Sequence, residues 1–354
     1  MTQAADLSST GLGAAARPDA AGLTVRRLAR RWSLLLILLA LLGVGFMLSL
    51  ASGAAGLSLR EVVNVLVGEA DSPAGRIVWQ IRMPRALLAG LVGLNLAVAG
   101  TLLQGIMRNP LAAPDIIGVT AGAGLMATAT LVLVEGLPTF LPLAAFVGAM
   151  VAAMVVYSIS WQPGAGTSPV RMVLAGVAVN LMLGAFTTFL MVAYGDRVQS
   201  VVFWMSGNLV DASWLKVRLI LPYTLVGCVM AVLLVRPLNA LQLGEDVATG
   251  LGVGVERSRL LAMAAASLLA ASAVSVAGLI GFVGLVVPHL MRLIVGHQHG
   301  RLLPMAVAAG AALMVWADFG ARTMLAPTEL PVGILTAMIG GPYFIFLLYR
   351  KKLL

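Results

Sequence analysis

Charged side chains are scarce in this chain of 354 residues: Asp, Glu, Lys and Arg together make up only 10% of it. Hydrophobic residues make up 60%, and the mean hydropathy is +1.00. A composition this apolar excludes an ordinary soluble globular domain. Cysteine is nearly absent, because Cys228 is the only one and lies in an apolar run. A disulfide framework and a cysteine metal site are therefore excluded.

Lysine is also rare, and the positions of the lysines exclude one kind of nucleotide site. A Walker A loop needs a lysine directly after a glycine, so that the amine reaches the phosphates. The three lysines are Lys216, Lys351 and Lys352, and none of them follows a glycine. We therefore expect no cofactor on this chain and no ATP hydrolysis by it alone. Any ATP-driven step needs another protein.

Groups for catalysis or ion coupling are equally sparse. No carboxylate lies at the centre of an apolar run, which weakens the alternative of an ion-coupled secondary carrier without excluding it. The sequence offers no paired nucleophile and base and no set of metal ligands, so an intramembrane enzyme is disfavoured. His297 and His299 flank a glutamine in a polar turn, and a solvated loop explains them better than a metal site.

Long apolar runs recur along the chain, and they are continuous rather than alternating. A helix needs about 20 such residues to cross the hydrocarbon core, and continuous runs favour helices over a barrel of strands. The pattern predicts an all-α, polytopic membrane protein with about ten transmembrane helices over 33–354, after a largely disordered cytoplasmic tail over 1–32. The predicted spans are about 33–50, 85–107, 115–134, 139–161, 170–193, 218–235, 260–280, 283–296, 303–320 and 332–349.

Basic residues gather at the ends of these runs, which explains the formal net charge of +9 without a nucleic-acid partner. Lys and Arg favour the cytoplasmic side of a membrane protein. Five arginines precede the first span, and Arg350, Lys351 and Lys352 follow the last. Both termini are therefore expected in the cytoplasm, as an even number of spans requires, with membrane lipid around the chain.

One polar segment interrupts the apolar pattern: residues 242–259, with the sequence QLGEDVATGLGVGVERSR. The segment holds five charged residues between two apolar runs, so it cannot lie in lipid. The distribution of basic residues places it on the cytoplasmic side. A glycine-interrupted polar segment in that position is a candidate contact surface for a partner protein.

Three arginines lie at the predicted outer ends of two spans, although Lys and Arg favour the cytoplasmic side. Arg82 and Arg85 stand at the outer end of the second span, and Arg322 stands at the outer end of the ninth. Surface arginines pair well with carboxylates, so an acidic soluble partner is one interpretation. Snorkelling of the side chains to the membrane interface is the other. Asn180, inside the fifth span, is either an interhelical hydrogen-bonding group or part of a transport pathway.

Four stretches of this chain resemble the FecCD-type permeases of bacterial importers for iron-siderophores, haem and vitamin B12. In chain order they are RMPRALLAGLVGLNLAVAGTLLQGIMRNPLAAPDIIGVTAGAG, GEDVATGLGVGVERSRLL, GLIGFVGLVVPHLMR and ADFGARTMLAPTELPVGILTAMIGGPYF. The resemblance runs from about residue 33 to the end of the sequence. It implies the ten-helix permease fold of the vitamin B12 importer.

The resemblance also implies partners. Two permease subunits, identical copies or paralogues, would surround one pathway in the bacterial inner membrane, with two ABC ATPases on the cytoplasmic side. ATP and magnesium would bind in those ATPases, and a periplasmic binding protein would deliver the substrate. An iron(III)-siderophore is the preferred substrate, because FWMSGNLVDASW looks more like the siderophore and haem permeases. Haem and cobalamin are the alternatives.

Three sets of site residues follow from the same resemblance. Arg82, Arg85 and Arg322 match arginines that meet glutamates of the binding protein. The fifth span matches the helix that lines the pathway, which indicates Asn180, Leu183 and Thr187 as pathway residues. The polar segment matches the family's coupling helices, at about 243–257, which rest on the ATPase. The coupling residues are then Gly244, Glu245, Asp246, Ala248, Leu251, Gly252 and Val253.

Overall fold

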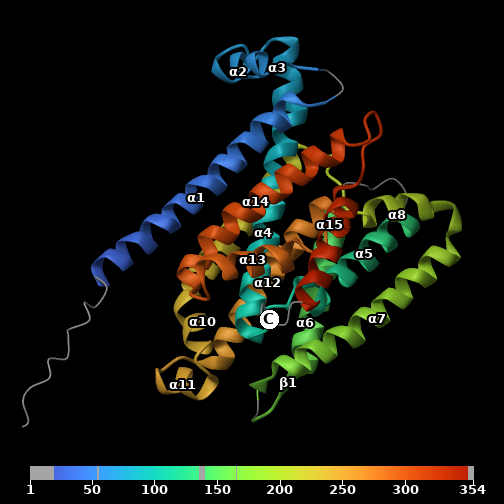
Figure 1. The fold of residues 1–354 in the computed structure, drawn as a ribbon. Coiled ribbons are helices and arrows are strands. Elements are labelled where there is room, and N and C mark those ends of the chain that lie inside the picture. The colour runs from blue at the N-terminus through green and yellow to red at the C-terminus, as the bar shows by residue number, and fades with distance from the viewer. Residues whose placement is uncertain (1–19, 54–55, 135–139, 165, 350–354) are drawn as a thin grey trace, which may run out of the picture.

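A computed structural model describes residues 20–53, 56–134, 140–164 and 166–349 (Figure 1). Nearly all of this part of the chain is helical. The only strands among the described residues are β1 (Trp161–Gln162) and β2 (Gly166–Thr167), which pair antiparallel with Trp161 opposite Thr167. The predicted all-α class is therefore confirmed.

Ten helices of 13 residues or more form the body of the described chain. By length and composition, seven helical spans could cross a membrane, and three further helices are apolar but shorter. Each of the ten predicted spans overlaps one of the ten helices. They are α1 (Ala20–Ala51), α4 (Met83–Met107), α5 (Val119–Leu133), α6 (Leu141–Ser160), α7 (Pro169–Ala193), α9 (Trp214–Leu233), α12 (Val255–Ala277), α13 (Val283–Val295), α14 (His299–Thr323) and α15 (Val332–Tyr349).

Short helical segments connect the long helices. They are α2 (Leu59–Val67), α3 (Pro73–Ile77), the π-helical turn η1 (Val78–Arg82), the 3₁₀ turns η2 (Pro114–Ile117) and η4 (Gly195–Arg197), α8 (Val198–Met205), α10 (Val235–Leu241) and α11 (Glu245–Gly250). The α3, η1 and α4 segments run on without a break, so the second span begins well before its predicted start at residue 85. Residues 20–32 of the predicted tail belong to α1, and residues 1–19 lie outside the described residues.

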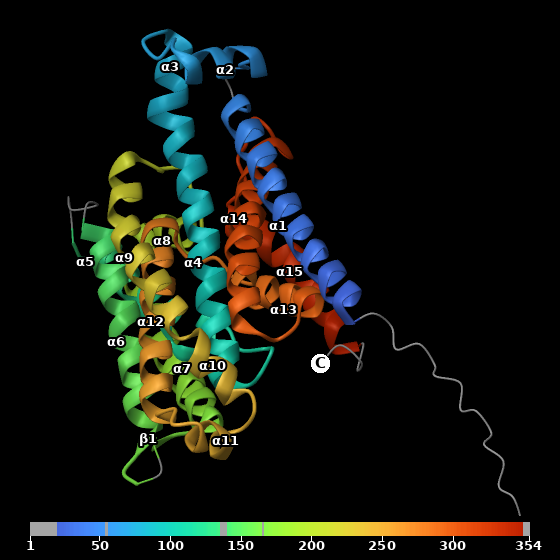
Figure 2. The same ribbon diagram turned by 90° about the vertical axis from the view of Figure 1, so that its left-hand side faces the viewer.

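Three helices form the centre of the bundle. In the most apolar stretches of the α3–α4 segment and of α12, 78% of the residues are buried, and the value for α14 is 72%. The same measure is only 22% for α1 and for α7, which lie at the outside (Figures 1 and 2). The exposed sides of these outer helices are apolar, as lipid or a second membrane subunit requires.

Glycines allow α4 to pack closely against two other helices. A Cβ at Gly93 would overlap the carbonyl oxygen of Gly310 in α14, and a Cβ at Gly100 would overlap that of Gly284 in α13. Small residues at such crossings let helix backbones approach each other, which strengthens packing in lipid. The interface of α4 with α13 and α14 therefore depends on the absence of side chains at these positions.

We expect Gly100→Ala to destabilise the protein by about 1–3 kcal/mol, because the methyl group forces backbone against backbone. The matched control is Gly90→Ala on the same helix, where the nearest atom to a new Cβ is Val315 Cγ2 at 3.9 Å. That variant should be neutral or slightly stabilising, since alanine favours helix more than glycine does. Thermal unfolding in detergent measures both, and equal midpoints for the two variants would contradict the packing role.

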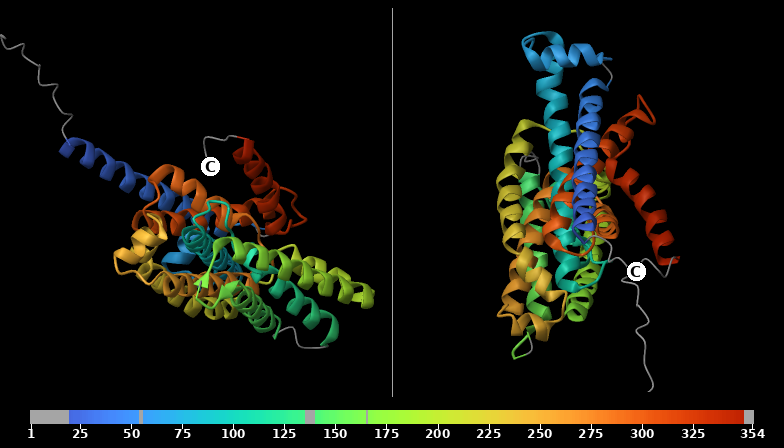
Figure 3. Two further views of the ribbon diagram at one scale, coloured as in Figure 1. Left: turned by 90° about the horizontal axis from the view of Figure 1, so that it is seen from below. Right: turned by 60° about the vertical axis from the view of Figure 1, so that its left-hand side comes forward.

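Different elements form the two ends of the bundle (Figures 1 and 3). At one end lie α2 and α3; Ser58 and Glu61 form a capping box at the start of α2, and the hydrogen bonds from Ser58 hold the pKa of Glu61 below its usual range. At the other end lie α11 and the β1–β2 hairpin. The first turns of α1 and the last turns of α15 lie toward the α11 end (Figures 1 and 2). Both ends of the described chain thus point to one side.

Candidate functional site

The polar segment 242–259 forms one short helix and the first turns of a long one. Gly244 has a positive φ of 112° and precedes α11, and Gly252, with a φ of 78°, follows its end. From Val255 the chain continues directly into α12. Coupling helices were expected over about 243–257, in a segment interrupted by glycines. The chain does break between α11 and α12, but the second helix is the start of the seventh predicted span.

An apolar stripe covers the outer side of this end. Leu243 lies just before α11, Val247 lies within it and Leu251 caps its end, and these three side chains are 65%, 48% and 64% exposed. We refer to these three residues as the apolar stripe. Such side chains at an aqueous end of the bundle indicate a protein contact. Leu243 and Val247 were not among the predicted coupling residues, although both stand in the polar segment beside residues that were.

The predicted coupling residues do not all face outward. Asp246, Leu251 and Gly252 are exposed, whereas Gly244, Glu245 and Val253 are half-buried. Ala248 is fully buried within the hydrophobic core. Ala248 therefore holds α11 against the bundle, and the exposed residues are those available to a partner.

Glu245 connects α11 to two neighbouring helices. Its Oε1 lies 2.5 Å from Arg259 Nη2 in α12 and 3.7 Å from Arg108 Nη2 at the end of α4. Arg259 also donates from Nη1 to the carbonyl oxygen of Thr167 in the β1–β2 hairpin, at 2.8 Å. A displacement of α11 would therefore reach α4 and α12, two of the central helices. Arg108 and Arg259 were not predicted as part of this site.

The three arginines expected to dock a binding protein lie at the opposite end of the bundle, and all are buried there. Arg85 Nη2 lies 3.0 Å from Asp318 Oδ1, and Arg85 Nη1 lies 2.9 Å from Glu329 Oε2. Arg322 Nε lies 3.2 Å from the other oxygen of Asp318. Asp318 is only 1% exposed, and it contacts two cations, one from α4 and one from α14. We refer to Arg85, Asp318, Arg322 and Glu329 as the charge cluster.

The same arginines also hold the end of α1. Arg82 donates from Nη1 to the carbonyl oxygens of Leu50 and Ala51, both at 2.7 Å. Arg322 donates to Ser49 Oγ at 2.6 Å. The last carbonyls of a helix lack intrahelical partners, and cations there also match the helix dipole. In this conformation the predicted docking arginines therefore bond within the chain.

The predicted pathway residues lie on the packed side of α7. Asn180 donates from Nδ2 to the carbonyl oxygen of Asp115 at 2.8 Å, Leu183 packs against the core, and Thr187 is 6% exposed. The exposed side of α7 instead carries large apolar residues. They include Leu181, Met182, Phe186, Phe189 and Val192.

Known proteins resemble this chain over most of its length and not only at these sites. The model of the FecCD transport family matches residues 38–350. The cobalamin import system permease protein BtuC of Halobacterium salinarum is 44% identical over 276 residues, which cover 78% of this chain and 74% of that protein. The hemin transport system permease protein HmuU of Yersinia pestis is 40% identical over 325 residues, which cover 90% of this chain and 95% of that protein.

A solved structure agrees with the fold. It is an ABC transporter assigned to the metal-chelate type, in an inward-facing conformation, with a TM-score of 0.79 and 32% sequence identity over 90% of this chain and 99% of that one. The relatives are permease components of import systems and are not themselves enzymes, because the ATPase is a separate subunit. This chain belongs to the FecCD transport family and is the multi-pass membrane permease of an ABC importer.

Proposed function

We propose that this permease forms the pathway for a metal chelate across the bacterial inner membrane, with an iron(III)-siderophore as the substrate. The observation that carries the proposal is the similarity, at 32% identity over 90% of the chain, to a metal-chelate transporter. Relatives named for Fe(3+)-citrate import in Bacillus subtilis support it, at 37% identity over 92% of the chain. The cobalamin and hemin relatives keep corrinoids and haem as alternatives.

The proposed assembly places the ATPases at the α11 end of the bundle and a second permease subunit beside it. ABC ATPases, which hold the ATP and magnesium, rest on the apolar stripe and on Asp246 next to it, so this end and both termini face the cytoplasm. Glu245 transmits the motion of α11 to α4 and α12 through its contacts with Arg108 and Arg259. A second permease subunit, identical or paralogous, covers part of the exposed apolar surface, and the pathway forms between the two with α7 lining it.

An ion-coupled carrier is the alternative from another class. Such a carrier needs a carboxylate that can take up and release a cation in the membrane. Asp318 is the buried carboxylate in α14, but both of its oxygens already contact Arg85 or Arg322. Because its charge is neutralised within the protein, Asp318 is poorly suited to ion coupling.

The substrate is tested with the cognate binding protein of this permease. Its affinity for an iron(III)-siderophore, haem and a corrinoid is measured by fluorescence quenching, followed by uptake of the best ligand by cells with and without the permease. We expect the iron chelate to bind most tightly and its uptake to require the permease. Preference for haem or a corrinoid would overturn the siderophore assignment and leave the importer assignment intact.

If the binding protein docks at the end of the bundle that carries Arg82, Arg85 and Arg322, a separate prediction follows. In that complex Arg82 would exchange the carbonyl oxygens of α1 for a carboxylate of the partner. Arg82→Gln should then weaken binding on the order of tenfold, and the loss should shrink between about 0.05 and 0.5 M salt. Surface plasmon resonance with the permease in nanodiscs measures both effects.

Two further variants make this docking test specific. Arg82→Lys keeps the charge and should retain most of the affinity, which separates charge from folding. Arg60→Gln removes an exposed arginine of α2 at the same end and should have a smaller effect. An Arg82→Gln variant that folds and binds like the native protein at every salt concentration would contradict docking at this residue.

A further inference from the structure

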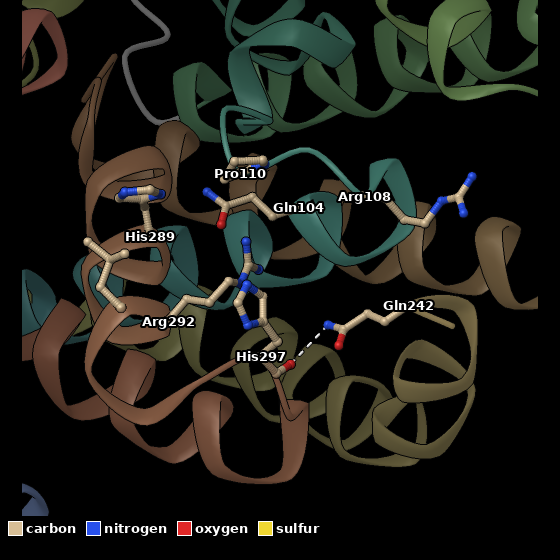
Figure 4. Close-up of a pocket in the computed structure, with 8 residues that line it drawn as sticks. Gln104, Arg108, Pro110, Gln242, His289, Arg292 and His297 are labelled. Carbon is tan, nitrogen blue, oxygen red and sulfur yellow. Dashed lines mark hydrogen bonds between the residues drawn. The ribbon is translucent and has the colours of Figure 1, made fainter. Parts of the chain in front are cut away.

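A cavity of about 360 Å³ lies near the α11 end, where α4 and α13 finish (Figure 4). Neither the coupling residues nor the charge cluster explains it. Its lining contains several nitrogen-bearing side chains, and none of the described lining residues is acidic. The lining residues are Gln104, Arg108, Pro110, Gln242, His289, Arg292, Leu293 and His297.

Arg292 is the cation at the centre of this cavity. Its side chain is buried, with 7% of the residue exposed, and its Nε and Nη2 have no hydrogen-bond partner among the described residues. Figure 4 shows the guanidinium of Arg292 pointing into the space between Gln104 and His297. Burial of a cation without a partner is unfavourable, and buried charges are ordinarily paired. No acidic side chain of the described residues lines the cavity to pair with this cation.

Histidines and an amide surround the same space. His289 is 3% exposed, and within the described part of the chain neither of its ring nitrogens has a partner. The loop that carries His297 is held in place, because Gln242 donates from Nε2 to the carbonyl oxygen of His297 at 2.9 Å. Arg108 points away from the cavity in Figure 4 and instead approaches Glu245. The unpaired donors thus belong to Arg292 and His289, on successive turns of α13.

The unpaired atoms of Arg292 suit an oxyanion. Nε and Nη2 form one edge of the guanidinium, and this edge donates two parallel hydrogen bonds to two oxygens of a phosphate or carboxylate. A neutral histidine donates a third hydrogen bond from one ring nitrogen. Next to the cavity, α13 exposes Leu290, Leu293 and Ile294, so an apolar surface leads to the polar site.

We propose that this cavity is a binding site for a phosphate group, held by the Nε and Nη2 edge of Arg292 with His289 as an additional donor. Two sources share this chemistry: the headgroup of an anionic phospholipid and free inorganic phosphate. Basic pockets between membrane helices near the cytoplasmic surface suit phospholipid headgroups. The acyl chains would then lie along the exposed leucines and isoleucine of α13. The proposal does not depend on the identity of the transported substrate.

The test uses full-length permease purified in detergent and freed of phospholipid. Thermal unfolding is followed in mixed micelles with phosphatidylglycerol or phosphatidylcholine, and separately with inorganic phosphate or chloride at equal ionic strength. We expect phosphatidylglycerol to stabilise the native protein more than phosphatidylcholine does, and Arg292→Gln to weaken that binding at least tenfold. Arg301→Gln is the matched control, because Arg301 is an exposed arginine at the same end.

Each possible result either supports the phosphate site or overturns it. Stabilisation by phosphatidylglycerol alone assigns a lipid headgroup, and stabilisation by inorganic phosphate as well assigns a site for phosphate in general. Without any ligand, Arg292→Gln should be at least as stable as the native protein, since the variant no longer buries an unpaired charge. The proposal is overturned if neither ligand stabilises the native protein, or if Arg292→Gln binds as tightly as Arg301→Gln does.

Discussion

Asp318→Asn is expected to lower the free energy of unfolding by about 3–5 kcal/mol, the loss typical of a broken buried ion pair. The native carboxylate is 1% exposed and contacts Arg85 at 3.0 Å and Arg322 at 3.2 Å. Asparagine keeps the size of the side chain but leaves two buried guanidinium groups without a full counter-charge. The contact between α4 and α14 near the end of α1 should therefore loosen. Titration with sodium dodecyl sulfate in mixed micelles, read by circular dichroism, measures the change.

The same cluster provides a matched control. Glu329 also contacts Arg85, at 2.9 Å, but 38% of its side chain is exposed. Solvent screens such a pair, so Glu329→Gln should cost no more than about 1 kcal/mol. Equal losses for the two variants, or a native-like Asp318→Asn, would show that burial does not determine the strength of this cluster.

Val247→Asp is expected to weaken association with the ATPase at least about 100-fold, because a carboxylate would enter an apolar contact at a cost of about 3 kcal/mol or more. Val247 is 48% exposed in the middle of the apolar stripe, so the free permease should fold normally. Co-purification of the ATPase with the permease, and its affinity for permease in nanodiscs, measure the loss. Substrate uptake should fall with it.

The control for this variant is the same substitution at the opposite end. Val67 in α2 is 82% exposed, and Val67→Asp should leave ATPase association unchanged. If both variants retain the ATPase, the stripe is not its contact surface. If both lose it, the effect of Val247→Asp is a general consequence of added negative charge.

The helices were predictable because lipid imposes a simple requirement on the sequence. A span must be apolar and about 20 residues long, and polar residues, Gly or Pro separate each of the ten predicted runs from the next. The short helices were harder to predict. The stretch Val235–Leu241 follows the sixth predicted span and contains Arg236, Pro237 and Asn239, and only the structure shows that it forms a separate helix, α10, after the end of α9 at Leu233.

The partners of the outer arginines could not be predicted. Arg82, Arg85 and Arg322 were predicted to be unusual for their side of the membrane, and this stays a prediction. Their contacts depend on packing: Arg85 and Asp318 lie 233 positions apart, and no local pattern connects them. Only the spacing of Asp318 and Arg322, four residues apart on one helix, was a visible signal.

The contacts of the polar segment 242–259, at the α11 end of the bundle, could not be predicted from the sequence either. Its polarity and glycines indicated a partner surface, and the apolar stripe is consistent with one. The sequence could not show that Ala248 faces the core or that Glu245 joins Arg108 and Arg259. Those facts arise from the way α11 packs on α10 and α12, after residues far apart in the chain have come together.

Uptake of the iron chelate into proteoliposomes tests whether an ATPase drives this permease. Vesicles contain the permease alone, or the permease with its ATPase, and the substrate-loaded binding protein is added outside. We expect uptake only with the ATPase and ATP inside the vesicles, and no uptake driven by a proton or sodium gradient. Gradient-driven uptake by the permease alone would contradict this function and favour an ion-coupled carrier.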